Sequence, residues 1–260
     1  MISFDKEKCV NCGICVDACP FSVLLRGEDV PSFRGEQYCI KCMHCAAACP
    51  KKAVLWNDQP AALEKSLPKI PDDFSETLEG YLQTVRSYRN FKPVPVEKEL
   101  LKHVLELSVW SPSAKNQHPT NWIVINDEAK LLTIMNLILA YVKESGNSLE
   151  IADEYEKGNN VVMGSAKTVV IAHARTNAIN PAVDTAIAMQ NITLMLNAHG
   201  VGSCWAGYLT RLSNVIPEIR ELIGVPEGHQ IFGAMMAGYP DGERYLSVPV
   251  RVKEPKISWQ

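Results

Sequence analysis

The chain has 260 residues, 47% of them hydrophobic, which is enough to bury the cores of one small and one medium domain. Its formal net charge is −3 and it has no basic run, so nothing indicates nucleic-acid binding. No apolar run reaches the ~18 residues that a membrane span requires, and the polar start of the chain does not resemble a signal peptide.

Two cysteine runs with the same spacing dominate the start of the chain. They read CVNCGICVDACP and CIKCMHCAAACP and hold eight of the nine cysteines. Three thiolates spaced by two residues can wrap around one iron–sulfur cube, while the fourth reaches the cube held by the other run. We therefore predict two [4Fe–4S] clusters. Their ligands are Cys9, Cys12, Cys15 and Cys49 for one cluster, and Cys39, Cys42, Cys45 and Cys19 for the other.

Other interpretations of these cysteines are weaker. A zinc ribbon uses two thiolate pairs per metal and has no use for a third, regularly spaced cysteine. A disulfide framework needs an oxidising compartment, whereas thiolates that must stay reduced favour the cytoplasm. With Gly13, Pro20 and Pro50 in place, the stretch resembles bacterial two-cluster ferredoxins. Residues 1–57 are thus predicted to be a two-[4Fe–4S] ferredoxin-like domain. His44 lies between cluster ligands and could form a hydrogen bond with a cluster sulfur, which would change the reduction potential of that cluster.

Prolines 60, 68 and 71 argue against a continuous helix after this domain, so residues 58–75 are predicted to be a linker. Helical spacing resumes near Thr77, with Leu78, Leu82 and Val85 on one face. The remaining chain, residues 76–260, is predicted to be a second domain with an extended tail.

The second domain alternates between helical and strand patterns. Helices are expected at 96–109, 131–142, 181–199 and 216–223, strands at 121–126, 167–174 and 230–238, and a strand or turn at 203–209. Residues 110–119 read as a proline-bounded loop, and residues 145–160 as a mobile helix or lid. Strands and helices without a strict βαβ repeat indicate an α+β fold.

Three short segments of the second domain could bind a cofactor. Arg86, Ser87 and Arg89 suit a phosphate monoester, although a solvated helix end is the simpler explanation when this segment is taken alone. Ser113 and Asn116 could bond a polar ring edge, or merely cap a turn. Backbone N–H groups at Gly202 and Ser203 could approach a ligand, or the glycine could only end a helix. No Rossmann or P-loop fingerprint is present.

Four motifs follow one another in the second domain: RSYRxF, SPSAxNxxP, GVGSCW, and MMAGYP with a distal arginine. In this order they resemble the nitroreductase family of FMN enzymes over residues 78–259. The resemblance implies a nitroreductase-like sheet flanked by helices, and it assigns roles to individual residues. Arg86, Ser87 and Arg89 hold FMN phosphate and ribityl oxygens, Ser113 and Asn116 meet the isoalloxazine, Gly202 and Ser203 face the ring, and Arg251, or alternatively Arg244, binds phosphate. Val85 replaces the first arginine of the RRSxR found in many relatives.

The expected function is that of an FMN oxidoreductase without a catalytic side chain. Electrons from a ferredoxin-like or other low-potential donor would enter through the clusters and reduce a nitroaromatic, quinone or enone. A homodimer is expected from the resemblance and the proline-rich tail. The alternatives are a non-enzymatic carrier between protein partners and a redox or iron sensor. Cys204 and the histidines at 103, 173, 199 and 229, scattered singly, are expected to be structural.

Overall fold

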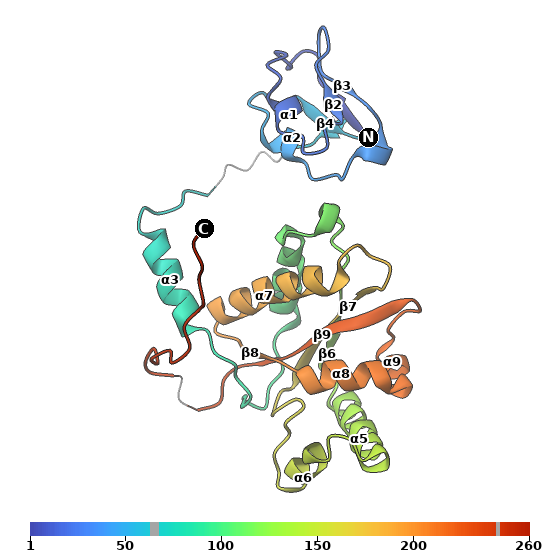
Figure 1. Cartoon of the computed structure of the whole chain (residues 1–260), viewed down its shortest axis with the longest axis vertical. Helices are drawn as coiled ribbons and strands as arrows, with labels where there is room; N and C mark the ends of the chain where they lie inside the picture. Colours follow the sequence, from blue (N-terminus) through green and yellow to red (C-terminus); the bar gives the residue numbers. More distant parts are fainter. Residues whose placement is uncertain (63–67, 243–244) are drawn as a thin grey trace. The chain divides into compact units, whose positions relative to one another are not determined.

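The computed structural model describes residues 1–62, 68–242 and 245–260 (Figure 1). The chain forms two units, one from residues 1–71 with 115–117 and the other from residues 72–114 with 118–260. Within the described ranges, no helix is both long enough and apolar enough to cross a membrane. The predicted domain limits stay predictions, and residues 63–67 of the predicted linker, like Arg244, lie outside the described residues.

The first unit is built from a repeated loop-and-helix segment. Its elements are β1 (Ile2–Phe4), α1 (Ile14–Asp17), β2 (Leu24–Leu25), β3 (Ser32–Phe33), the 3₁₀ turn Glu36–Tyr38, α2 (His44–Ala47), β4 (Val54–Trp56) and β5 (Gln59–Pro60). The two halves share their backbone as well as their cysteines. Matching residues adopt left-handed φ in both halves, at Asn11 and Lys41, Gly13 and Met43, and Ser22 and Lys52. The repeat in the sequence is therefore a repeat in the backbone.

The two ends of this unit close on each other. β1 pairs antiparallel with β4, so that Ile2 lies opposite Trp56. The small core beneath them contains Val23, Leu24 and Ala46. Such a core is small for an independent domain, which fits a unit whose stability depends on bound metal.

Part of the predicted linker folds back as a strand. Asn57 and Asp58 both have left-handed φ, which is the geometry of a tight two-residue hairpin turn. Gln59–Pro60 then pair with β4 as an edge strand, where proline is tolerated because its missing N–H faces outward. The proline pattern alone could not distinguish this edge strand from a linker.

The second unit contains one antiparallel sheet in the order β6-β7-β9-β8 (Figure 1). The strands are β6 (Asn121–Ile125), β7 (Thr168–Arg175), β8 (Gly202–Trp205) and β9 (His229–Gly238). The helices are α3 (Phe74–Thr84), α4 (Lys98–Glu106), α5 (Glu128–Ser145), α6 (Glu150–Glu156), α7 (Pro181–Ala198), α8 (Gly207–Val215) and α9 (Pro217–Ile223). Two 3₁₀ turns, Leu107–Trp110 and Ala114–Asn116, lie between α4 and β6.

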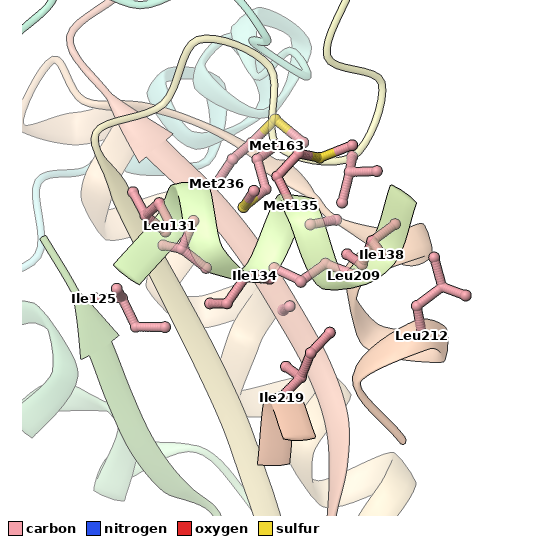
Figure 2. Close-up of a cluster of buried hydrophobic side chains, with 14 of the residues drawn as sticks. Ile125, Leu131, Ile134, Met135, Ile138, Met163, Leu209, Leu212, Ile219 and Met236 are labelled. Carbon is pink, nitrogen blue, oxygen red and sulfur yellow. The ribbon is translucent and has the colours of Figure 1, made fainter. Parts of the chain in front are cut away.

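Helices cover both faces of the sheet. On β7, Val170 and Ala172 share a buried cluster with α4 and α7. The alternate residues Val169 and Ile171 share another with α5, α8 and α9, part of which is shown in Figure 2. β7 is therefore buried almost from end to end, as a central strand covered on both sides must be. The predicted α+β fold is confirmed.

Some predicted elements differ from the structure. The helix expected at 96–109 ends at Glu106 and continues as a 3₁₀ turn that leaves Val109 exposed. Residues 145–160 contain the short helix α6. The sequence pattern did not predict α8, because its apolar run continues directly from β8. The apolar positions of α3 are mostly uncovered, since Leu78 is 38% and Leu82 47% exposed.

Candidate functional site

The eight clustered cysteines line two hollows in the first unit. One hollow, of about 350 Å³, is lined by Cys9, Cys12, Cys15 and Cys49. The other, of about 400 Å³, is lined by Cys39, Cys42, Cys45 and Cys19. Each hollow takes three thiols from one run and the fourth from the other run, which is the grouping that crossed ligation of two cubes requires.

In each hollow, a backbone N–H group points at the sulfur of the fourth cysteine, which comes from the other cysteine run. Val23 N donates to Cys19 Sγ at 3.4 Å, and Ala53 N donates to Cys49 Sγ at 3.2 Å. These two contacts occupy the same place in the two halves of the repeat. A further contact joins Lys41 N to Cys39 Sγ at 3.4 Å. Such donors stabilise negative charge on a thiolate and hence on a bound cluster.

Two thiols that line the hollows have raised pKa values. Burial, followed by the neighbouring thiols of Cys42, Cys15 and Cys39, raises the pKa of Cys45 to about 11. Burial and then Cys49 likewise raise the pKa of Cys15. A bound cluster would have to displace the protons of these two thiols, as thiolate ligation generally demands. Four soft sulfur ligands per hollow, with inward N–H donors, fit an iron–sulfur cube.

In the second unit, two segments distant in sequence lie side by side. Ser87 forms an isolated parallel bridge with Ser203, and Tyr88 N donates to Ser203 O at 3.1 Å. A Cβ atom on Gly202 would lie 2.7 Å from the Tyr88 ring, so only glycine allows this approach. The fold thus brings together two of the three segments singled out in the sequence.

The two arginines of the first segment have different surroundings. Arg86 Nη1 donates to the carbonyls of Gln83 and Val85 at 2.6 and 2.8 Å, which ties this side chain to the end of α3. The Arg86 guanidinium also lies 5.9 Å from the ring centroid of Tyr245, where the C-terminal tail begins. Arg89 instead lines an open cavity of about 1090 Å³.

The Arg89 cavity, as we call it, combines aromatic, apolar and charged side chains. It is lined by Arg89, Glu150, Val161, Trp205, Gly207, Tyr208, Arg211 and Met236. Tyr208 Oη donates to Glu150 Oε1 at 3.1 Å, which raises the pKa of Tyr208. Arg211 stacks on the Tyr208 ring at 5.5 Å and donates to Ser148 Oγ at 2.9 Å. Half of the lining residues are charged or carry a hydroxyl and the others are apolar or aromatic, so the cavity offers both hydrogen-bonding groups and apolar surface to a ligand.

Most residues of the Arg89 cavity were missed in the sequence. Glu150 belongs to α6, while Tyr208 and Arg211 belong to α8, and they meet only in the tertiary structure. The single local signal was Trp205, because it lies two residues after Ser203, one of the predicted ring-facing residues.

The loop segment lines a different cavity. Ser113 borders a hollow of about 310 Å³ with Ser108, Ser111, His118, Thr120 and Asp184, and this hollow shares no lining residue with the Arg89 cavity. Asn116 has a left-handed φ of 56° in the 3₁₀ turn. Arg251 lies on the exposed tail, whose residues Val250 and Trp259 are 88% and 91% exposed.

Two histidines that were expected to be isolated form a pair. His173 on β7 and His229 on β9 place their Nδ1 atoms 2.9 Å apart. Burial, and then the neighbouring His229, lower the pKa of His173. The sequence showed no sign of this because the register of two strands creates the pair. Cys204 is buried as expected, with 6% of its surface exposed.

Comparisons with known proteins match both units. Residues 82–239 match the model of the nitroreductase family, and residues 1–59 match the 4Fe-4S dicluster domain. An Archaeoglobus fulgidus protein, provisionally named NADH dehydrogenase/NAD(P)H nitroreductase, is 26% identical over 166 residues, covering 63% of this chain and 85% of that protein. A Methanothermobacter thermautotrophicus protein with the same provisional name is 26% identical over 176 residues, covering 66% and 83%.

Solved structures share the fold of the second unit. A nitroreductase from Bacteroides fragilis, described with bound FMN, superposes with a TM-score of 0.60 at 22% identity, covering 70% of this chain and 98% of that chain. A nitroreductase from Desulfitobacterium hafniense, also described with bound FMN, gives a TM-score of 0.58 at 22% identity and the same coverage. The sheet flanked by helices that the motifs predicted is therefore confirmed.

Proposed function

Because the chain belongs to the nitroreductase family and begins with a 4Fe-4S dicluster domain, we propose that it is an FMN oxidoreductase fed by two [4Fe–4S] clusters. Its acceptor is a small, electron-poor molecule of the nitroaromatic, quinone or enone type. The observation that carries the proposal is the grouping of the eight thiols around two hollows, each in a three-plus-one set. A stand-alone flavin enzyme has no use for such a unit.

The residues of the second unit fit FMN. Bound FMN would supply the exchange between one-electron and two-electron transfer. Arg89 lines a cavity of aromatic, apolar and charged side chains, and its guanidinium suits the phosphate. The neighbouring Ser87 and Ser203 offer hydroxyls and backbone groups to the ribityl chain and the ring. Trp205 and Met236 provide aromatic and apolar surface against which a planar ring packs.

A second copy of the chain completes this site in the proposal. Ser113 lines a separate cavity beside Asp184 in the first turn of α7, whereas Ser203 follows the other end of that helix. A helix of 18 residues is roughly 27 Å long, so one flavin does not reach both groups within one chain. A two-fold partner can bring its own Ser113 and Asn116 to the flavin. The uncovered apolar side chains of α3 and of the tail supply surface for such a homodimer.

Electrons are proposed to enter from a reduced ferredoxin or another low-potential, one-electron donor. The linker holds the cluster unit at a local concentration of roughly millimolar relative to the flavin unit, if it can span the gap. A tethered donor makes a nicotinamide site unnecessary. Thiols that must stay reduced favour the cytoplasm as the place of action.

The test is anaerobic steady-state turnover of the full-length protein with reduced ferredoxin as donor. Nitroaromatic, quinone and enone acceptors are each supplied in turn, and loss of the acceptor is followed. We expect turnover of at least one acceptor class, with the FMN and the clusters both reduced in its absence. Tight FMN binding and rapid reduction of a partner protein, without turnover of any small acceptor, would instead establish the electron-carrier alternative.

A further inference from the structure

A row of polar contacts ties the loop at residues 111–120 to helix α7. Asp184 Oδ1 accepts a hydrogen bond from Ala114 N at 3.0 Å. Farther along the helix, Asn191 Nδ2 donates to Ser111 Oγ at 2.8 Å. The hydroxyls of Thr185 and Thr120 lie 3.1 Å apart. One helix therefore holds the start, the middle and the end of this loop.

The loop that α7 holds has an unfavourable backbone. Lys115, Asn116 and His118 all have left-handed φ, at 49°, 56° and 43°, although none is glycine. Such conformations persist only where the surroundings impose them, and they concentrate at functional sites. Within the loop, His118 N donates to Ser113 Oγ at 3.0 Å. The contacts to α7 and this internal bond hold the residues that flank Lys115 and Asn116 in place.

Asp184 is unusual among these anchors. Its side chain is only 4% exposed, and its Oδ2 atom is buried with no hydrogen-bond partner in the part of the chain that the structure describes. It lines the 310 Å³ hollow together with Ser113 and Thr120. An acidic residue in the first turn of a helix is favourable, but that effect does not require burial. A buried carboxylate oxygen without a donor is costly, so a further donor is expected there.

We propose that Asp184 is a positioning residue that sets the 111–120 loop in its flavin-binding conformation before FMN arrives. Oδ1 fixes the backbone at Ala114, next to Ser113. Oδ2 accepts from a buried water that the hydroxyls of Ser113 and Thr120 share, since the hollow has room for one and both residues line it beside Asp184. This inference rests on the proposed function, in which the loop contributes Ser113 and Asn116 to the flavin.

The test is FMN titration of the full-length, flavin-depleted protein, followed by flavin fluorescence. We expect Asp184→Ala to weaken FMN binding about tenfold or more, because the Ala114 N–H loses its acceptor. Asp184→Asn keeps an oxygen for that N–H and should retain most of the affinity, which separates positioning from a need for charge. Asp127→Ala is the matched control, since Asp127 also accepts a backbone N–H, from Lys130, but at the start of α5. It should leave FMN binding unchanged.

Unchanged FMN affinity in a folded Asp184→Ala protein overturns the inference while leaving the proposed function intact. Failure of the wild-type protein to bind FMN overturns both. If Asp184→Ala does not fold, hydrogen exchange of the wild type decides. Slow exchange at Ala114 in the flavin-depleted protein supports a preset loop, whereas exchange that slows only after FMN binds overturns it.

Discussion

The two units place their functional residues in opposite ways. In the first unit, all eight cluster cysteines lie within residues 9–49, and the spacing of the ligands follows from the geometry of the group they hold. In the second unit, Arg89, Glu150 and Tyr208 meet in one cavity although they come from well-separated segments. The ligands of a metal cluster can thus be recognised in a short stretch of sequence. The residues around a non-covalently bound organic cofactor are brought together mainly by the tertiary structure.

The largest effect is expected from breaking the crossed ligation of the first unit. Cys19→Ala should remove the cluster held by Cys39, Cys42 and Cys45, because Cys19 lines their hollow. Iron content of anaerobically purified protein should fall from roughly eight to roughly four atoms per chain. Electron paramagnetic resonance of the reduced protein would show which cluster remains.

Cys204→Ala is the matched control for that variant. Cys204 is the ninth cysteine and is buried in the second unit, so its loss should leave the iron content unchanged. Loss of the cluster on Cys9, Cys12 and Cys15 in the Cys19 variant would mean that each run holds its own cluster.

The contrast between the units also explains what could be predicted from the sequence. The strand at 167–174 was found within one residue at each end because its β-branched residues form a continuous apolar run. The helix from Pro181 was found because a proline opens it and glycine follows it. The partnership of Tyr208 with Glu150, and that of His173 with His229, could not be found, because each depends on how separate elements pack.

A second variant tests how far the flavin site of the second unit extends along the chain. Ending the chain after Pro249 should weaken FMN binding about tenfold or more, because it removes Arg251, the proposed phosphate ligand. Ending it after Lys253 keeps Arg251 and should have a smaller effect. If both shortened proteins bind FMN as tightly as the full-length chain does, Arg251 is not part of the flavin site.

A third variant tests the close approach of the two segments at Ser87 and Ser203. Gly202→Ala places a Cβ atom against the Tyr88 ring and should lower the free energy of unfolding by about 1–3 kcal/mol. Thermal unfolding with and without FMN would measure it. Gly80→Ala is the control: nothing lies within 4 Å of its Cβ position on α3, so the helix should gain up to about 1 kcal/mol. Equal unfolding temperatures for Gly202→Ala and the wild type would contradict the contact.

The smallest effect concerns the histidine pair. Because the pKa of His173 is lowered in the folded state, the unfolded chain binds more protons over the interval between the two pKa values. Stability should therefore fall as the pH drops below about 6.5, the ordinary histidine value, and level off below the folded pKa. Unfolding by urea at several pH values measures this slope. A His173→Asn protein should lose part of the slope, and an unchanged slope would assign it to other groups.

The central claim is that electrons pass from the cluster unit to the flavin of the second unit. The most direct measurement is anaerobic stopped flow that follows the flavin band after mixing with reduced ferredoxin or with NADPH. The account predicts that ferredoxin reduces the flavin of the full-length protein faster than NADPH does. In the Cys19→Ala protein, which should still bind FMN, only the rate of flavin reduction by ferredoxin should fall strongly. Equal flavin reduction by NADPH in both proteins, with no response to ferredoxin in either, would contradict it.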